Sequence, residues 1–260
     1  MNDTDQSVDQ RRPNLIAELG LVVEAVGDEL HGHADVVAHM HAPGTSTLRM
    51  SILVAWADTV LGLLALQSIT PRLPVTLELG VDLAAPVDGC ETVHMIGRVI
   101  KVGSTVVVLA IEFADGEGAR LGIGHSLFMA APDPGMSMPT GTWALDRFSS
   151  YRGALAEPFA ERAGCTRIGP GVAEMRNGRA VQNSGRMLNG GLVSLVVEEA
   201  ALSADPDGRT LASMMLRYLR PVRTGPAIAQ ADLHAGLGTV QVHDAGTDAL
   251  AIVATTRCFG

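Results

Sequence analysis

The chain has 260 residues, of which 47% are hydrophobic and 3% aromatic, and its formal net charge is −9. That length allows one large domain or two ordinary ones with a sizeable core. The negative charge and the lack of a long basic run exclude a surface for nucleic acid or an anionic membrane, because both need clustered positive charge. An anionic ligand would need a local basic patch.

The cysteines and the N-terminus indicate the compartment. Cys90, Cys165 and Cys258 are an odd number without short spacing, which is typical of neither a disulfide framework nor a zinc site. The polar N-terminus lacks the apolar segment of a secretory signal. The longest apolar stretch, Ile52–Leu66, is interrupted by polar residues and is expected to be too short to cross a bilayer. We therefore expect a cytoplasmic protein that needs no membrane.

In the first half of the chain, a short helix at Leu15–Leu19 is expected to precede a hairpin with a turn at Gly27-Asp28. A long apolar helix around Ile52–Leu66 follows. The hairpin strands are expected at Leu21–Val26 and His31–Met40, and later strands at Val75–Leu83, Thr92–Val102, Thr105–Ala114 and Arg120–Ala130.

The second half repeats this order after a Pro/Gly/Ser-rich segment at 132–142, whose composition indicates a linker. A short helix is expected at Leu155–Arg162, and a long apolar helix after Gly190-Gly191. The strands are expected at Cys165–Ile168 and Val172–Val181, with a turn at Asn177-Gly178, and then at Leu211–Leu219, Ala227–Leu237, Thr239–Ala245 and Ala249–Cys258.

Local similarity between the halves indicates a tandem duplication. Residues 17–20 resemble 161–164, residues 51–58 resemble 191–198, and residues 81–87 resemble 216–222. The spacing between partners drifts by a few residues, as loop insertions would cause. The predicted divisions are a tail at 1–12, unit one at 13–131, a linker at 132–150 and unit two at 151–260.

Each unit predicts an α+β fold in which a long antiparallel sheet wraps around a central helix. A helix that is apolar nearly all round needs such a cover, and the later strands are rich in Val, Ile and Ala. This is the hotdog arrangement. The duplication predicts two tandem hotdog units that form an intramolecular pseudo-dimer.

The second unit also resembles a particular family, the hotdog acyl-CoA thioesterases of the phenylacetyl-CoA and 4-hydroxybenzoyl-CoA type. Asn183, Asn189-Gly190-Gly191 and Glu198 have the spacing at which that family carries Asn or Gln, then His-Gly-Gly, then Asp or Glu. Asn189 replaces the usual His. The resemblance covers both units and implies hydrolysis of an acyl-CoA thioester without a metal or redox cofactor, with CoA entering only as part of the substrate.

The chemistry of the family explains this spacing. A thioester carbonyl becomes an oxyanion when it is attacked, and backbone N–H groups at a helix N-terminus stabilise that charge. Glycine lets the carbonyl approach closely. The resemblance implies that the acid attacks the thioester or activates water, and that acid and Gly N–H come from different units in homodimeric relatives.

Unit one has Asp58 as the corresponding acid, but its loop reads Arg49-Met50-Ser51 in place of His-Gly-Gly. Unit two has both the loop and Glu198. The pairing of units in relatives then predicts one working site per chain, in which the acid is Asp58. Glu198 either belongs to a second catalytic site or forms an ion pair with Arg49.

The remaining roles follow from the same resemblance. The Gly190 N–H would polarise the thioester carbonyl, Asn183 would orient the carbonyl or water, and Asn189 would support the loop. Asp58 would act as nucleophile or general base, and burial would raise its pKa toward neutrality.

Several charged side chains have two interpretations. Arg217, Arg220 and Arg223 either bind the phosphates of CoA or only solubilise a strand end. The two His-x-His pairs, at His31 and His33 and at His39 and His41, lack acidic or Cys ligands nearby, which favours a solvated strand face over a metal site.

Two other functions stay open. A non-catalytic acyl-CoA binder is compatible with Asn189 in place of His and with the altered loop of unit one. A hotdog hydratase or dehydratase would use an Asp and His pair at the helix, but neither long helix contains a His. By analogy with the family, two such chains could pair through their sheet faces as a homodimer.

Overall fold

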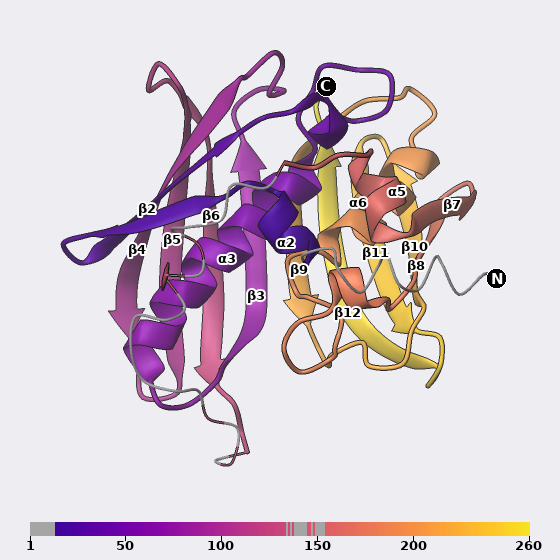
Figure 1. Ribbon diagram of the computed structural model, residues 1–260. Helices are drawn as coiled ribbons and strands as arrows, with labels where there is room; N and C mark the ends of the chain where they lie inside the picture. The colour runs from indigo at the N-terminus through magenta and orange to yellow at the C-terminus, as the bar shows by residue number, and fades with distance from the viewer. Residues whose placement is uncertain (1–13, 134, 136, 138–144, 147, 149–153) are drawn as a thin grey trace.

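The computed structural model describes residues 14–260 except 134, 136, 138–144, 147 and 149–153. The predicted tail at 1–12 lies outside these residues, as does most of the predicted linker at 132–150. In the described part, two similar sets of elements lie side by side and share one sheet (Figure 1).

The first set follows the predicted order. It consists of α2 (Leu15–Glu18), β1 (Val22–Val26), β2 (Glu29–Asp35), η1 (Ala38–Met40), α3 (Met50–Ile69), β3 (Pro74–Leu83), β4 (Thr92–Val102), β5 (Val106–Asp115) and β6 (Arg120–Ala130). The strand expected at His31–Met40 is too long, because β2 ends at Asp35 and a short 3-10 helix follows. Asp35 pairs with Thr92, the first residue of β4, so the partner strand ends there as well.

The second set repeats the first. It consists of α5 (Phe159–Ala163), β7 (Cys165–Gly169), β8 (Val172–Met175), η2 (Arg179–Val181), α6 (Ser194–Ala204), β9 (Leu211–Tyr218), β10 (Ala227–His234), β11 (Leu237–Asp244) and β12 (Ala249–Cys258). The turn expected at Asn177-Gly178 is wrong, since β7 and β8 are joined through Gly171, whose φ is 71°. The helix begins after Pro158 and not at Leu155, because a residue before proline avoids helical geometry.

The twelve strands of the described residues form one antiparallel sheet in the order β1-β2-β4-β5-β6-β3-β9-β12-β11-β10-β8-β7. The order within the second half mirrors that of the first, which is the relation expected of a two-fold pseudo-dimer. The halves join where β3 pairs with β9, from Glu78 opposite Arg217 to Asp82 opposite Ser213. The predicted α+β class with central helices is confirmed.

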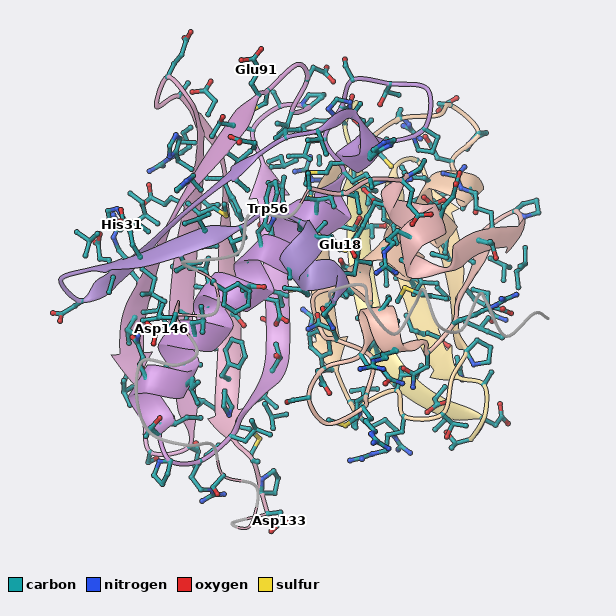
Figure 2. All side chains as sticks on the ribbon, viewed as in Figure 1. Glu18, His31, Trp56, Glu91, Asp133 and Asp146 are labelled. Carbon is teal, nitrogen blue, oxygen red and sulfur yellow. The ribbon has the colours of Figure 1, made fainter. Side chains whose placement is uncertain are left out.

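Helix α3 crosses the first half of the sheet (Figure 1), and 13 of its 20 residues are buried. Trp56 is 1% exposed, and its indole N–H donates to the Leu19 carbonyl at 3.2 Å. Figure 2 places Glu18 near α3, between the two halves, and Glu91 and Asp133 at the periphery. The helix is long and apolar enough to cross a membrane, so the expectation that this stretch is too short was wrong; its burial is that of a core helix.

The second central helix is shorter than predicted. Helix α6 has 11 residues, against 20 in α3. Residues 191–193 form a turn before it, and Asp205 is extended after it, with ψ of 113°. Pro206 explains the end, because the residue before proline is driven out of helical geometry. Only the first unit therefore has a long central helix.

The packing of α3 on the sheet predicts opposite effects for two Gly→Ala substitutions. A Cβ at Gly97 would lie 2.7 Å from Val60 Cγ1, whereas one at Gly62 would meet only Phe128 Cζ at 3.8 Å. We expect Gly97→Ala to lower the free energy of unfolding by about 1–3 kcal/mol through overpacking. Gly62→Ala should raise it by roughly 0.5–1 kcal/mol through helix propensity. Urea denaturation measures both; equal effects of the two would contradict this packing.

Candidate active site

Asp58 lies on the part of α3 that faces the start of α6, where the two units meet. Its side chain is half-buried. The Gly191 N–H donates to Asp58 Oδ2 at 2.9 Å, and Thr76 Oγ1 lies 3.4 Å from Oδ1. The structure thus brings an acid of unit one next to the Gly-Gly loop of unit two.

The surroundings of Asp58 change its acidity. Burial raises the pKa of Asp58 to about 6, although the hydrogen bonds from Gly191 and Thr76 act in the opposite direction. A carboxyl group with that pKa is mostly ionised at neutral pH and yet basic enough to accept a proton.

The two glycines of the loop serve different purposes, and neither has a left-handed φ. A Cβ at Gly191 would lie 2.9 Å from Ala55 Cα and 2.9 Å from Asp58 Cβ, so the close approach of α3 requires glycine there. A Cβ at Gly190 would lie 3.5 Å from Asp58 Oδ2, which is ordinary contact. Glycine at 190 therefore keeps the space beside the carboxylate open.

Asn189 fixes the loop. Its Oδ1 accepts from the Leu192 N–H at 3.1 Å, which closes the turn that precedes α6. Its own N–H donates to the Val181 carbonyl at 2.8 Å. Within the described part of the chain, the next N–H, that of Gly190, has no hydrogen-bond partner. An unused donor in the turn before α6 therefore lies beside Asp58.

Sequence reasoning missed Tyr218, at the end of β9. Its hydroxyl donates to the Gly190 carbonyl at 2.8 Å. The aligned position in unit one is Leu83, so the only signal in the sequence was an aromatic residue with a polar end where the repeat has an aliphatic one.

Asn183 closes its own loop. Its Oδ1 accepts from the N–H groups of Gly185 and Met187, at 2.9 Å and 3.2 Å. Among the described residues, no hydrogen bond joins Asn183 to Asp58 or Gly190. The predicted role of Asn183 in orienting the carbonyl or water stays a prediction.

Glu198 occupies the position that mirrors Asp58, and it is 2% exposed. It accepts from the Met50 N–H at 2.8 Å, from Ser51 Oγ at 2.5 Å and from Arg49 Nη1 at 3.3 Å. The ion pair with Arg49 is thus the arrangement found. Burial raises the pKa of Glu198, against the opposing effects of the Arg49 charge and the Ser51 hydrogen bond. The chain's own groups engage both oxygens of this carboxylate.

The same guanidinium also serves the neighbouring acid. Arg49 Nη1 donates to Glu199 Oε1 at 2.6 Å, and Arg167 Nε donates to Glu199 Oε2 at 2.5 Å. Arg49 and both acids are buried. Removal of one partner from such a cluster leaves an uncompensated buried charge and destabilises the fold, so the cluster has a structural role.

The three arginines suggested for phosphate binding are all exposed but differ in their partners. Arg217 Nε lies 3.1 Å from Glu78 Oε2. Neither Arg220 nor Arg223 has an ion-pair partner among the residues that the structure describes. The Leu188 N–H donates to the Val222 carbonyl at 3.0 Å, which ties this basic segment to the residue before Asn189.

In the described ranges, no group of three or more His, Cys, Asp or Glu side chains is placed to hold a metal ion. His31 pairs with Glu29 at 2.9 Å, and the rings of His33 and His94 are 6.2 Å apart. The three cysteines are unpaired.

Comparisons with known proteins agree with the fold. Residues 51–121 match the model of the Thioesterase superfamily. The structure is similar to a 12:0-ACP thioesterase from Umbellularia californica, with a TM-score of 0.64, 11% identity and coverage of 90% of this chain and 98% of that one. An acyl-ACP thioesterase from Bacteroides thetaiotaomicron has a TM-score of 0.62, 11% identity and coverage of 90% and 98%. No curated protein matches the sequence. At these identities, the similarity establishes the fold.

The packing around Gly190 and Gly191 predicts that alanine at these two positions changes the free energy of unfolding by different amounts. Gly191→Ala should lower the free energy of unfolding by about 1–3 kcal/mol, because its Cβ would enter α3. Gly190→Ala should change stability by less than about 1 kcal/mol, because its Cβ makes only ordinary contacts. Thermal and urea unfolding measure both. A Gly190→Ala protein as unstable as Gly191→Ala would show that the space beside Asp58 is not open.

Proposed function

We propose that this chain hydrolyses acyl thioesters, with acyl-CoA as the substrate class, at one composite site per chain. The observation that carries the proposal is the position of Asp58, from α3, beside the free Gly190 N–H in the turn before α6. Hydrolysis needs a base for water and a donor for the oxyanion, and these two groups supply both. The match of residues 51–121 to the Thioesterase superfamily supports the same reaction.

The reaction uses the Gly190 N–H as the donor and the Asp58 carboxylate as the base. The thioester carbonyl oxygen accepts the Gly190 N–H, which polarises the carbonyl carbon and then stabilises the oxyanion. Asp58 takes a proton from water as the water oxygen bonds to that carbon. When the carbon–sulfur bond breaks, the proton passes from Asp58 to the leaving thiolate, so the products are a carboxylic acid and a thiol.

The two carboxylate oxygens of Asp58 have different roles in this reaction. Oδ2 is held by the Gly191 N–H at 2.9 Å, whereas the contact of Oδ1 with Thr76 is long, at 3.4 Å. Oδ1 is therefore the less engaged oxygen, and we assign to it the proton taken from water. Attack by Asp58 itself would instead form an anhydride with the acyl group as the carbon–sulfur bond breaks and the thiol leaves. Water would then release the carboxylic acid and regenerate Asp58.

The free charges of Arg220 and Arg223 support CoA as the carrier. A chain with a net charge of −9 needs a local basic group to bind the phosphates of CoA, and these two guanidiniums lack acidic partners in the described residues. The similar structures carry acyl-ACP names, so the substrate panel should include an acyl carrier protein.

A non-catalytic acyl-CoA binder is the second candidate. The observation that favours it is Asn189 at the position of the family's His, because Asn189 here only caps the loop. A hydratase or dehydratase is disfavoured, since neither α3 nor α6 contains a histidine.

Hydrolysis of aryl, short-chain and long-chain acyl-CoAs by the wild type, Asp58→Asn and Glu198→Gln tests the proposal. Asp58→Asn should lower kcat by about 10²–10⁴-fold, the usual contribution of a general base. Glu198→Gln should keep kcat within about threefold but lose stability, because it weakens a buried charge cluster. Wild-type kcat/KM should rise with pH through about 6, the pKa of Asp58.

Each outcome has a distinct meaning. Loss of turnover in Glu198→Gln, with Asp58→Asn fully active, would contradict the composite site. No turnover of any thioester by the wild type, with acyl-CoA still bound, would make the protein a binder. Turnover of an acyl carrier protein substrate alone would keep the reaction and change the carrier.

A further inference from the structure

The peptide group between Gly190 and Gly191 is held at both ends. Its carbonyl oxygen accepts from Tyr218 Oη at 2.8 Å, and its N–H donates to Asp58 Oδ2 at 2.9 Å. Among the described residues, Tyr218 is the only donor to that carbonyl. One peptide plane thus connects β9 of unit two with α3 of unit one.

A peptide between two glycines needs such a restraint. Glycine populates positive and negative φ about equally, so rotation of this peptide plane meets little steric resistance. A flipped plane would point the Gly190 carbonyl at the Asp58 carboxylate and remove the N–H from it. Capping by Asn189 fixes the peptide planes on either side but bonds neither atom of this one.

The mirrored position in unit one supports a specific role for the phenol. Leu83 aligns with Tyr218, and Leu83 has no hydroxyl to donate. That half also has Met50-Ser51 in place of the two glycines, with the Met50 N–H bound to Glu198. The phenol therefore occurs only in the half that has a Gly-Gly loop to hold.

We propose that Tyr218 is a positioning residue that locks the Gly190–Gly191 peptide, so that Gly191 holds Asp58 and the adjacent Gly190 N–H points at the substrate carbonyl. The inference rests on the proposed hydrolysis for its kinetic part only. Its structural part, the coupling of the Tyr218 hydroxyl to Asp58 through one peptide group, holds whatever the substrate is.

The proton on Tyr218 is available for this role at any physiological pH. Burial raises the pKa of Tyr218 well above its ordinary value, and the nearby Asp58 charge acts in the same direction. The phenol therefore remains a donor, and its acceptor stays the Gly190 carbonyl.

The test is Tyr218→Phe, which keeps the ring and removes the hydroxyl. We expect kcat to fall about tenfold, the equivalent of one neutral hydrogen bond, with KM within twofold, because the Gly190 donor acts mainly in the transition state. Carbon-13 NMR of labelled Asp carboxyl groups, assigned with Asp58→Asn, measures the pKa of Asp58. This pKa should be higher in Tyr218→Phe than in the wild type, because the hydrogen bond from the Gly191 N–H that lowers it is weakened.

Thr256→Val is the matched control. It removes a buried hydroxyl from β12, and this hydroxyl has no hydrogen-bond partner among the described residues. Thr256 lies four residues beyond Ile252, which pairs with Tyr218 across the two strands. It should leave both kcat and the Asp58 pKa unchanged. Wild-type values of both in Tyr218→Phe would overturn the inference. If the wild type hydrolyses no thioester, the proposed function fails, but the NMR titration still decides the coupling.

Discussion

The close crossing of α3 and the start of α6 is the constraint on which the rest of the structure depends. Gly191 has no room for a Cβ against Ala55 and Asp58, and Ser194 Oγ lies 3.2 Å from the Ser51 carbonyl. This contact sets the distance from Asp58 to the loop of the other unit. It also buries Glu198 against the start of α3. Both carboxylate sites are therefore consequences of one helix contact.

The two sites share an origin but differ in what surrounds the acid. Asp58 has one backbone donor, one long hydroxyl contact and an unused N–H nearby. Glu198 has its oxygens engaged by backbone, hydroxyl and guanidinium, and Arg49 fills the place that Asn189 has in the other half. Duplication within one chain allows this divergence, because each half can change without the other. One shared site keeps an acid beside an unused N–H, and the other holds its acid in a buried ion-pair cluster.

Much of the fold could be predicted, because Thr92–Val102, Arg120–Ala130 and Ala249–Cys258 have clear strand composition bounded by turns. The juxtaposition of Asp58 with Gly190 came from a family resemblance, not from composition. The Tyr218 contact could not be predicted, because it depends on where β9 ends relative to the loop. The apolar run predicts a long second helix, but the proline after Asp205 ends α6 after 11 residues.

We propose that each chain has one working site, shared between its units. The most direct test is calorimetric titration with a non-hydrolysable thioether analogue of the acyl-CoA that is turned over fastest. We expect one analogue bound per chain, because Arg49 and Ser51 already occupy the surroundings of Glu198. Binding of two analogues per chain, or the same affinity for the analogue in Gly190→Ala as in the wild type, would contradict a single shared site.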